Sequence, residues 1–215
     1  MRKTHSQITY DQIAPFYRKI SIEKKNYLSS IDKIIFRYFL RRKTLVDLGS
    51  GDGIRIYRLA RRARINNITL VDNSDKMIEA SKKIPGAKVV KSSILVYLPK
   101  EKFDIATCLW NVLGHLDNAD DIRKTILNID NNILKRNGVL ILDVNNRYNV
   151  LSYGIKQVIK NVAIDLFGRT KYKYTEFYKK VGKKLIKMRV HFFTPYEIEN
   201  YLKHTSLKII TRAFL

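Results

Sequence analysis

Between residues 44 and 144, short runs rich in β-branched residues alternate with amphipathic stretches. The runs fall at 44–48, 68–72, 87–91, 103–109 and 139–144, and each has the length of a buried strand. Strands that alternate with helices join into a parallel sheet through right-handed crossovers. The alternation therefore predicts an α/β fold, a doubly wound Rossmann-like and mostly parallel sheet flanked by helices.

The stretch before the fifth run carries the marks of a helix. Asp117 or Asn118 can cap its start, and Asp120 and Asp121 fall in the first turn, where the helix dipole favours carboxylates. Gly138 and the basic residues just before it are expected to close the helix. Its apolar stripe consists of Ile122, Ile126, Ile129 and Ile133.

After residue 144 the pattern changes. Residues 151–166 place apolar side chains on one face of a helix, and residues 172–178 then alternate as a strand does. A turn at 181–183 leads to a second alternating run at 185–193. We therefore expect a helix-plus-hairpin insertion after the fifth strand.

The end of the chain predicts one more helix and one more strand. Thr194 can cap a helix that has Pro195 at its first position and Glu197 in a capping box, and the helix is expected to run to His204. Residues 207–214 have the pattern of a final strand. Such a strand would form an unpaired edge that favours dimerisation, and the sequence leaves the oligomeric state open.

Length and composition fit one domain, since 215 residues with 45% hydrophobic content can bury a full core. The single Cys108 excludes a disulfide framework and a multi-cysteine zinc site. The chain starts without the apolar segment of a signal peptide, and no run approaches the roughly 18 apolar residues of a spanning helix. We expect a reduced, cytoplasmic protein without a transmembrane segment.

The charge has two interpretations that the sequence leaves open. A formal charge of +23 creates a field that attracts RNA, DNA or anionic lipid. The chain is also rich in Ile, Asn and Tyr, as an AT-rich genome would bias it, and lysine then serves only as the solvated residue.

A glycine-bearing loop follows the first strand, where Gly49, Gly51 and Gly53 alternate with other residues before the next helix. This spacing differs from G-x-G-x-x-G and contains no Gly-Lys-Ser/Thr, so it favours a ligand that is not held by phosphates. The second strand ends at Asp72, where a carboxylate can accept from both hydroxyls of a ribose. We expect Ser74 to cap the following helix and Asp72 to face the ligand.

These residues resemble the class I S-adenosylmethionine-dependent methyltransferases. The similar segments are VDLGSGDG at 46–53, VDNSDKMIEA at 71–80, FDIATCLWNVLGHL at 103–116 and ILKRNGVLILDVNN at 133–146. The resemblance extends upstream to the tyrosine-bearing segment 8–17 and downstream to HFFTPYEIENYL, and so covers nearly the whole chain.

The resemblance implies that the cofactor is S-adenosyl-L-methionine. Gly49 and Gly51 would lie against its methionine part, Asp47 near its amino group and Asp72 on its ribose hydroxyls. The family often has an acid after the third strand to contact the adenine, and Ser93 stands there in this chain. The expected cofactor-binding residues are Tyr10, Asp47, Gly49, Ser50, Gly51, Asp72, Asn73, Met77, Ser93, Ile94 and Leu109.

Catalysis is expected from the segment after the fourth strand, where the family usually contacts its substrate. His115 could accept a proton from the nucleophile, or could simply pack beneath the next helix. Asn111 would help to position the substrate, and Tyr17 could close over the cofactor or merely pack its own helix. The acids at 117–121 fit a helix N-terminus, so we expect no metal.

The sequence supports three functions. The first is transfer of a methyl group to an N or O atom of a small molecule, the second is RNA methylation through the basic surface, and the third is non-catalytic nucleic-acid binding on the same fold. Residues 151–167 could also contact a membrane peripherally as an interfacial helix. We expect a single domain 1–215, with an N-terminal helical cap (1–43), a cofactor-binding core (44–146), a basic substrate lid (147–193) and a C-terminal helix and strand (194–215).

Overall fold

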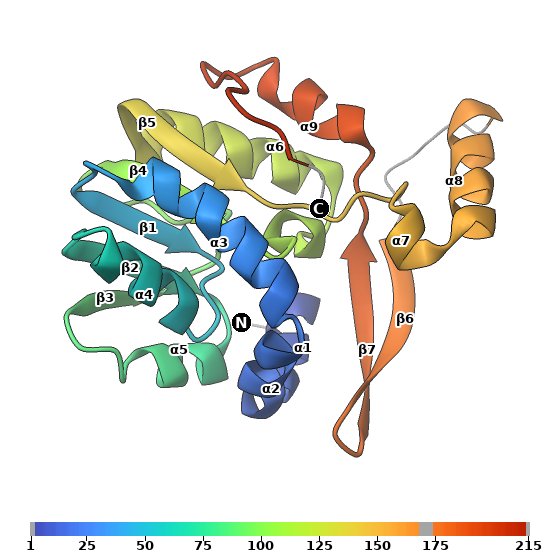
Figure 1. The fold of residues 1–215 in the computed structure, drawn as a ribbon, viewed down its shortest axis with the longest axis horizontal. Coiled ribbons are helices and arrows are strands. Elements are labelled where there is room, and N and C mark those ends of the chain that lie inside the picture. Colours follow the sequence, from blue (N-terminus) through green and yellow to red (C-terminus); the bar gives the residue numbers. More distant parts are fainter. Residues whose placement is uncertain (1–2, 168–173, 214–215) are drawn as a thin grey trace.

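The core of the protein is a five-stranded sheet in which every neighbouring pair of strands is parallel. The computed structural model describes residues 3–167 and 174–213. The strand order is β3-β2-β1-β4-β5, which confirms the Rossmann-like sheet (Figure 1). The strands are β1 (Thr44–Leu48), β2 (Asn67–Asp72), β3 (Ala87–Lys91), β4 (Phe103–Cys108) and β5 (Leu134–Leu142).

Helices cover both faces of this sheet because successive strand residues point to opposite sides. Leu45 packs with α3 (Lys25–Phe39) and α4 (Ile54–Arg62) in one apolar cluster. Val46 packs in a second cluster with α6 (Ala119–Asn128), its π-helical continuation Ile129–Ile133 and α9 (Pro195–Leu202). The remaining crossover helix is α5 (Asp75–Ser81), and Ser74 caps it as expected by accepting from the Met77 N–H at 3.2 Å.

The N-terminal helices lie at the carboxyl ends of the strands (Figure 1). They are α1 (His5–Ile13), a 3₁₀ turn (Ala14–Phe16) and α2 (Tyr17–Glu23). Beside them stands the predicted hairpin, β6 (Tyr174–Val181) and β7 (Lys184–His191), which forms a separate antiparallel sheet. Its inner face packs on α1 through a cluster of Ile13, Val181, Ile186, Met188 and Val190. Tyr172, which we expected in this hairpin, lies outside the described residues.

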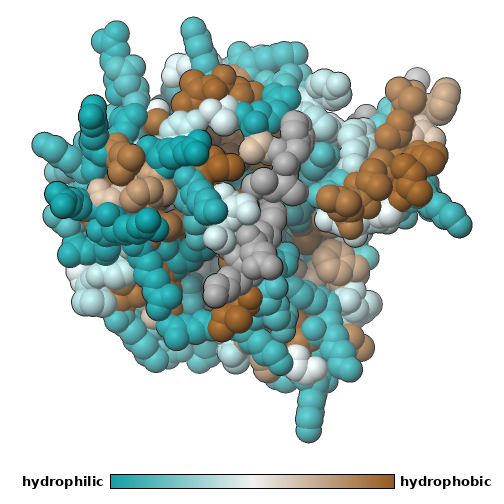
Figure 2. Space-filling model, in the orientation of Figure 1, coloured by the Kyte–Doolittle hydropathy of each residue, from teal (hydrophilic) through white to brown (hydrophobic). Residues whose placement is uncertain are grey.

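The insertion before the hairpin differs from the single helix that we expected over 151–166. It consists of α7 (Val150–Tyr153) and α8 (Ile155–Phe167), because Gly154 has a φ of 78° and interrupts the helix. Val158 is buried, whereas Ile159 is 61% and Phe167 90% exposed. These helices therefore project from the body with an apolar surface (Figure 2).

Two helix ends and one left-handed turn differ from what the sequence predicts. The helix after Asn118 does not run to Gly138: β5 already begins at Leu134, and Asn137 rather than Gly138 adopts the left-handed backbone, with a φ of 64°. The helix that begins at Pro195 ends at Leu202, two residues earlier than expected.

The predicted last strand is absent over residues 207–213, and residue 214 lies outside the described part. The segment has no sheet partner, and Ile210 is 70% exposed. Side-chain contacts hold it instead: Thr211 bonds the Tyr38 hydroxyl, and Arg212 pairs with Glu199. The edge of the described sheet on this side is therefore β5. None of the described helices is long and apolar enough to cross a membrane.

The loop from β1 to α4 depends on Gly53, which precedes the helix with a φ of 68°. A Cβ at this position would lie 2.4 Å from Leu70 Cδ1. Gly86 has the same kind of backbone, with a φ of 73°, but nothing lies within 4 Å of a Cβ there. An alanine at Gly86 would therefore introduce backbone strain alone, whereas an alanine at Gly53 would add a steric clash.

Gly53→Ala should destabilise the protein by about 2–4 kcal/mol, because left-handed strain of about 1–2 kcal/mol adds to the overpacking against Leu70. Gly86→Ala should cost only the strain, about 1–2 kcal/mol. Urea unfolding measures both through the midpoint at constant slope. Equal losses in the two variants would show that the Leu70 contact relaxes without cost.

Candidate functional site

Strand β1 delivers a buried carboxylate to the carboxyl edge of the sheet. Asp47 is 4% exposed, and the Thr107 hydroxyl on β4 donates to its Oδ1 at 2.6 Å. Burial raises the pKa of Asp47 to about 7. Within the described residues no cation forms an ion pair with Asp47. A cationic group of a ligand could therefore pair with this carboxylate.

Asp72 at the end of β2 joins two loops. Its Oδ2 accepts from the Gly51 N–H at 2.8 Å, and its Oδ1 accepts from the Ser74 N–H at 2.8 Å. Burial raises its pKa to about 6, against the effect of these hydrogen bonds. Each carboxylate oxygen can accept more than one hydrogen bond, which leaves capacity for hydroxyl donors of a ligand.

Two side chains fill the space directly over the glycines. A Cβ on Gly49 would lie 2.6 Å from Val112 Cγ1, and a Cβ on Gly51 would lie 2.7 Å from the Tyr17 hydroxyl oxygen. The glycines therefore allow Val112 and Tyr17 to approach the loop closely. Between them Ser50 presents a buried hydroxyl without a hydrogen-bond partner, which fits a loop that binds a polar ligand.

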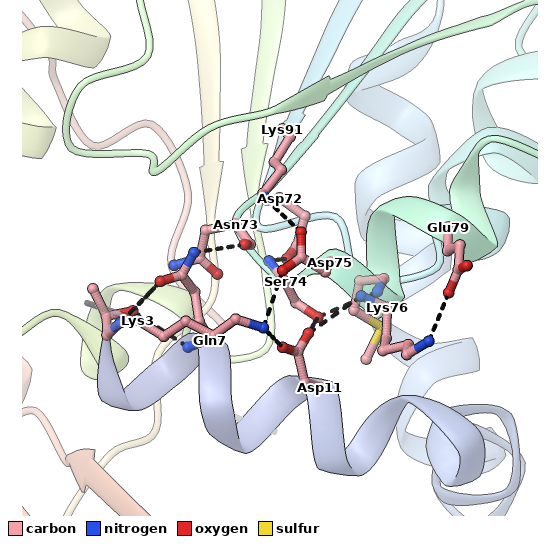
Figure 3. Close-up of polar contacts among 12 residues, drawn as sticks. Lys3, Gln7, Asp11, Asp72, Asn73, Ser74, Asp75, Lys76, Glu79 and Lys91 are labelled. Carbon is pink, nitrogen blue, oxygen red and sulfur yellow. Dashed lines mark hydrogen bonds and ion pairs between the residues drawn. The ribbon is translucent and has the colours of Figure 1, made fainter. Parts of the chain in front are cut away.

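Helix α1 is tied to the loop that follows β2 (Figure 3). The Asn73 amide donates to the Ser6 hydroxyl at 3.3 Å, and the Gln7 amide donates to the Asn73 carbonyl at 2.9 Å. The Ser74 hydroxyl donates to Asp11 at 2.7 Å. Because the Asn73 side chain turns toward α1, its part in this structure is to hold the helix over the site.

Tyr10 and His115 meet inside the site. The Tyr10 hydroxyl lies 3.0 Å from His115 Nε2, and the two rings pack edge to face. Burial, assisted by the charge of His5, lowers the pKa of His115 to about 4. Burial and the nearby Asp72 raise the pKa of Tyr10. At neutral pH the imidazole and the phenol are therefore both uncharged.

The Asn111 side chain forms hydrogen bonds with the backbone around the site. It is 2% exposed; its amide donates to the His191 carbonyl at 3.1 Å and accepts from the Asn145 N–H at 3.0 Å. Asn111 and Trp110 both have left-handed backbones, with φ of 58° and 62°. Such strain in large residues persists only where the surroundings enforce it, and it is concentrated at functional sites.

Of the other predicted cofactor residues Met77, Ser93, Ile94 and Leu109, only Leu109 lines the cavity. Met77 is 1% and Ile94 6% exposed, and both are buried in the apolar interior. Leu109 is 7% exposed and lines the cavity beside Trp110. The Ser93 hydroxyl accepts from the Leu95 N–H at 3.3 Å and so shapes the turn after β3.

Sequence reasoning missed several residues of the site. Asp143 follows β5 and accepts from the Trp110 N–H at 3.3 Å, and burial raises its pKa. Its signal was present, since it stands at the carboxyl end of a strand, where Asp47 and Asp72 also stand. Thr107 could not be recognised in the same way, because only the β1–β4 pairing brings it to Asp47.

A cavity opens beside Trp110, between the carboxyl edge of the sheet, the N-terminal helices and the hairpin. Its walls include Tyr10, Tyr17, His115 and Asp143, whereas Asp47, Asp72 and the glycines of the loop after β1 are not part of its lining. Among the described residues, no group of three His, Cys, Asp or Glu side chains is placed to hold a metal ion.

Comparisons with known proteins agree with this geometry. Residues 46–142 match the family model of a methyltransferase domain, and no curated protein matches the sequence. An S-adenosylmethionine-dependent methyltransferase from Clostridium acetobutylicum shares 20% identity over 91% of this chain and 89% of that chain, with a TM-score of 0.61. DhpI, in a SAM–HEP complex, shares 14% identity over 92% and 86%, with a TM-score of 0.69.

The sugar N-methyltransferase KedS8 from a Streptoalloteichus species shares 12% identity over 81% of this chain and 75% of that chain, with a TM-score of 0.57. At these identities the solved structures establish the fold, while the family model identifies the domain within it. Residues 46–142 therefore match a methyltransferase domain, and the chain has the fold of S-adenosylmethionine-dependent methyltransferases.

Proposed function

We propose that this methyltransferase transfers a methyl group to an N or O nucleophile of a small molecule. The observation that carries the proposal is the cavity beside Trp110, which helices and the hairpin line on several sides. A concave space with aromatic side chains in its walls suits a compact acceptor. KedS8, which has the same fold, is described as a sugar N-methyltransferase.

The cofactor supplies a methyl group that is already activated on a sulfonium. We assign Asp47 to its amino group, Asp72 to its ribose hydroxyls and Ser50 to a polar contact beside them. Two buried carboxylates with raised pKa values fit a cationic ligand, because each lacks an ion-pair partner in the described chain. Met77, Ile94 and Leu109 would supply apolar walls for the adenine.

In the proposed reaction the protein aligns the acceptor and excludes water. His115 is neutral at pH 7, and its ring is held by the Arg189 backbone; the Tyr10 hydroxyl could take the proton of the acceptor while it passes its own proton to His115 Nε2. Tyr17 would form a wall of the site over Gly51. Asn111 would act as a positioning residue, since both ends of its amide hold backbone.

RNA methylation is the alternative, and a specific surface favours it. Six exposed arginines on and beside α3 and α4 form no ion pair within the described residues, and unpaired arginines attract phosphates. A nucleic-acid-binding protein without catalysis would use the same surface. The six are Arg37, Arg41, Arg58, Arg61, Arg62 and Arg64.

Two further assignments stay proposals. The exposed apolar side chains of α8, with Lys156 and Lys160 on the same helix, fit peripheral contact with an anionic membrane. A cytoplasmic location is supported by the single buried Cys108, which provides no disulfide.

Asp72→Asn should weaken S-adenosylmethionine binding by at least about tenfold, because a charge-assisted hydrogen bond to the ribose would be lost. Isothermal titration calorimetry measures the affinity. Asp75→Asn is the matched control, since its exposed carboxylate pairs with Lys3 and Lys91 at the surface and should leave the affinity unchanged. Unchanged binding in the folded Asp72 variant would remove this residue from the cofactor site.

Cofactor binding should release protons near pH 6–7. Asp47 is largely protonated below its pKa of about 7, and a bound ammonium group favours its ionised form, so binding lowers that pKa. The release should approach about one proton near pH 6 and vanish above about pH 8. Calorimetry in buffers of different ionisation enthalpy measures it. Asp47→Asn should abolish most of the release, and an identical release in that variant would contradict the assignment.

The acceptor class can be decided by a screen for S-adenosylhomocysteine formation. Small amines, amino sugars and phenols should support turnover, whereas unfractionated tRNA and rRNA should not. Turnover should fall in His115→Gln, with cofactor affinity retained, because the proton acceptor is lost. Methylation of RNA alone would favour the alternative function.

A further inference from the structure

Unpaired hydrogen-bond donors gather around Trp110. The Trp110 indole N–H is buried and has no hydrogen-bond partner. Lys24, at the end of α2, holds its Nζ 5.9 Å from the centre of the indole ring. A buried donor without an acceptor costs free energy, so a donor that persists at the wall of a cavity indicates a ligand acceptor.

Lys179 brings a second cation to the same cavity. It lies on β6 directly opposite Ile186, and residues opposite each other in an antiparallel pair share a face. That face carries the buried Ile186 and Met188, which pack toward the N-terminal helices. Lys179 therefore points inward from the hairpin, where an ammonium is partly desolvated. Burial and the charge of Lys24 lower its pKa, so the two lysines repel each other.

Two acids line the same cavity as this pair. They are Glu23 and Asp143, and neither forms an ion pair with Lys24 or Lys179 in the described part of the chain. Asp143 accepts from the Trp110 backbone N–H, and burial favours its protonated form. Glu23 is exposed at the rim. The cluster thus holds three hydrogen-bond donors, two of them cationic, and neither lysine forms an ion pair in the described part of the chain.

We propose that Lys24, Lys179 and the Trp110 indole N–H form a subsite for an anionic group of the methyl acceptor. A phosphate or phosphonate and a carboxylate share the chemistry that these donors recognise. The inference rests on the proposed function, since it assigns an acidic small molecule to the cavity beside the methyl donor. It also gives the charge at this end of the molecule a role other than solvation.

The cofactor carries a carboxylate of its own, and that group is the competing occupant. Tyr17 stands between the two regions, with its hydroxyl over Gly51 and its ring 5.4 Å from that of Trp110. Tyr17 therefore contacts both the glycine loop and the wall of the subsite, so the subsite lies next to the cofactor site. A test must consequently be made with the cofactor site filled.

Trp110 is the only tryptophan of the chain, so all tryptophan fluorescence comes from the indole at this subsite. The protein is titrated with methylphosphonate, with acetate and with sodium chloride at matched ionic strength, first free and then saturated with S-adenosylhomocysteine. We expect a saturable change with methylphosphonate or acetate in both forms, beyond the effect of chloride. The anion that binds more tightly identifies the acidic group. No change beyond chloride would overturn the proposal.

Lys24→Gln and Lys179→Gln should each weaken this binding by about tenfold, because each removes a charged donor. Lys183→Gln, in the exposed hairpin turn, is the matched control and should bind as the unaltered protein does. Equal binding in all variants would overturn the subsite. Loss of anion binding on saturation with S-adenosylhomocysteine would instead assign the subsite to the cofactor carboxylate and overturn its assignment to the acceptor.

The proposed function is tested separately, by calorimetry of the same variants with S-adenosylmethionine. Retained cofactor affinity in Lys24→Gln and Lys179→Gln is expected. A folded protein that binds methylphosphonate but no cofactor would defeat the proposed function without defeating the anion site.

Discussion

The buried carboxylate of Asp72 is the constraint on which the site depends. By accepting from the Gly51 and Ser74 backbone N–H groups, it joins the loop after β1 to the loop after β2. The second loop in turn holds α1 through Asn73 and Ser74. The position of Tyr10 over the site therefore follows from contacts that begin at one carboxylate. A change at Asp72 acts on the shape of the site as well as on any ligand.

The fold was largely predictable because its signals are local. Strand runs and the cap at Ser74 depend on neighbours in the sequence, and both were confirmed. The predictions were wrong where a tertiary contact or a single backbone angle determines the local structure. Gly154 interrupts the insertion helix, and Asn137 takes the left-handed turn that Gly138 was expected to take. Residues 207–213 carry a strand pattern but find no partner strand.

The residues of the site that lie at strand ends could be predicted from the sequence, and the others could not. Asp47 and Asp72 are recognisable because parallel strands bring their carboxyl ends to one edge, and Asp143 could have been found by the same rule. Lys24 and Lys179 carry no such signal, since 155 positions separate them and only the packing of the hairpin on the N-terminal helices brings them to one cavity. Asn111 follows β4, where the sequence predicts a substrate contact, and the structure shows that both ends of its amide hold backbone.

Acidic and basic side chains occupy different parts of the molecule. Asp47 and Asp72 are buried at the strand ends and Asp143 is partly buried beside them, and all three have raised pKa values. The site therefore has room for positive ligand charge, while the cations stand at the rim and on the outer helices. A sulfonium cofactor and an acidic acceptor would approach such a site from opposite sides, each toward its own counter-charge. Electrostatics would then orient the acceptor before any contact with the methyl group is made. This arrangement explains how a strongly basic chain can bind a cationic cofactor: the net charge lies on its surface, and the local charge of the cofactor site has the opposite sign.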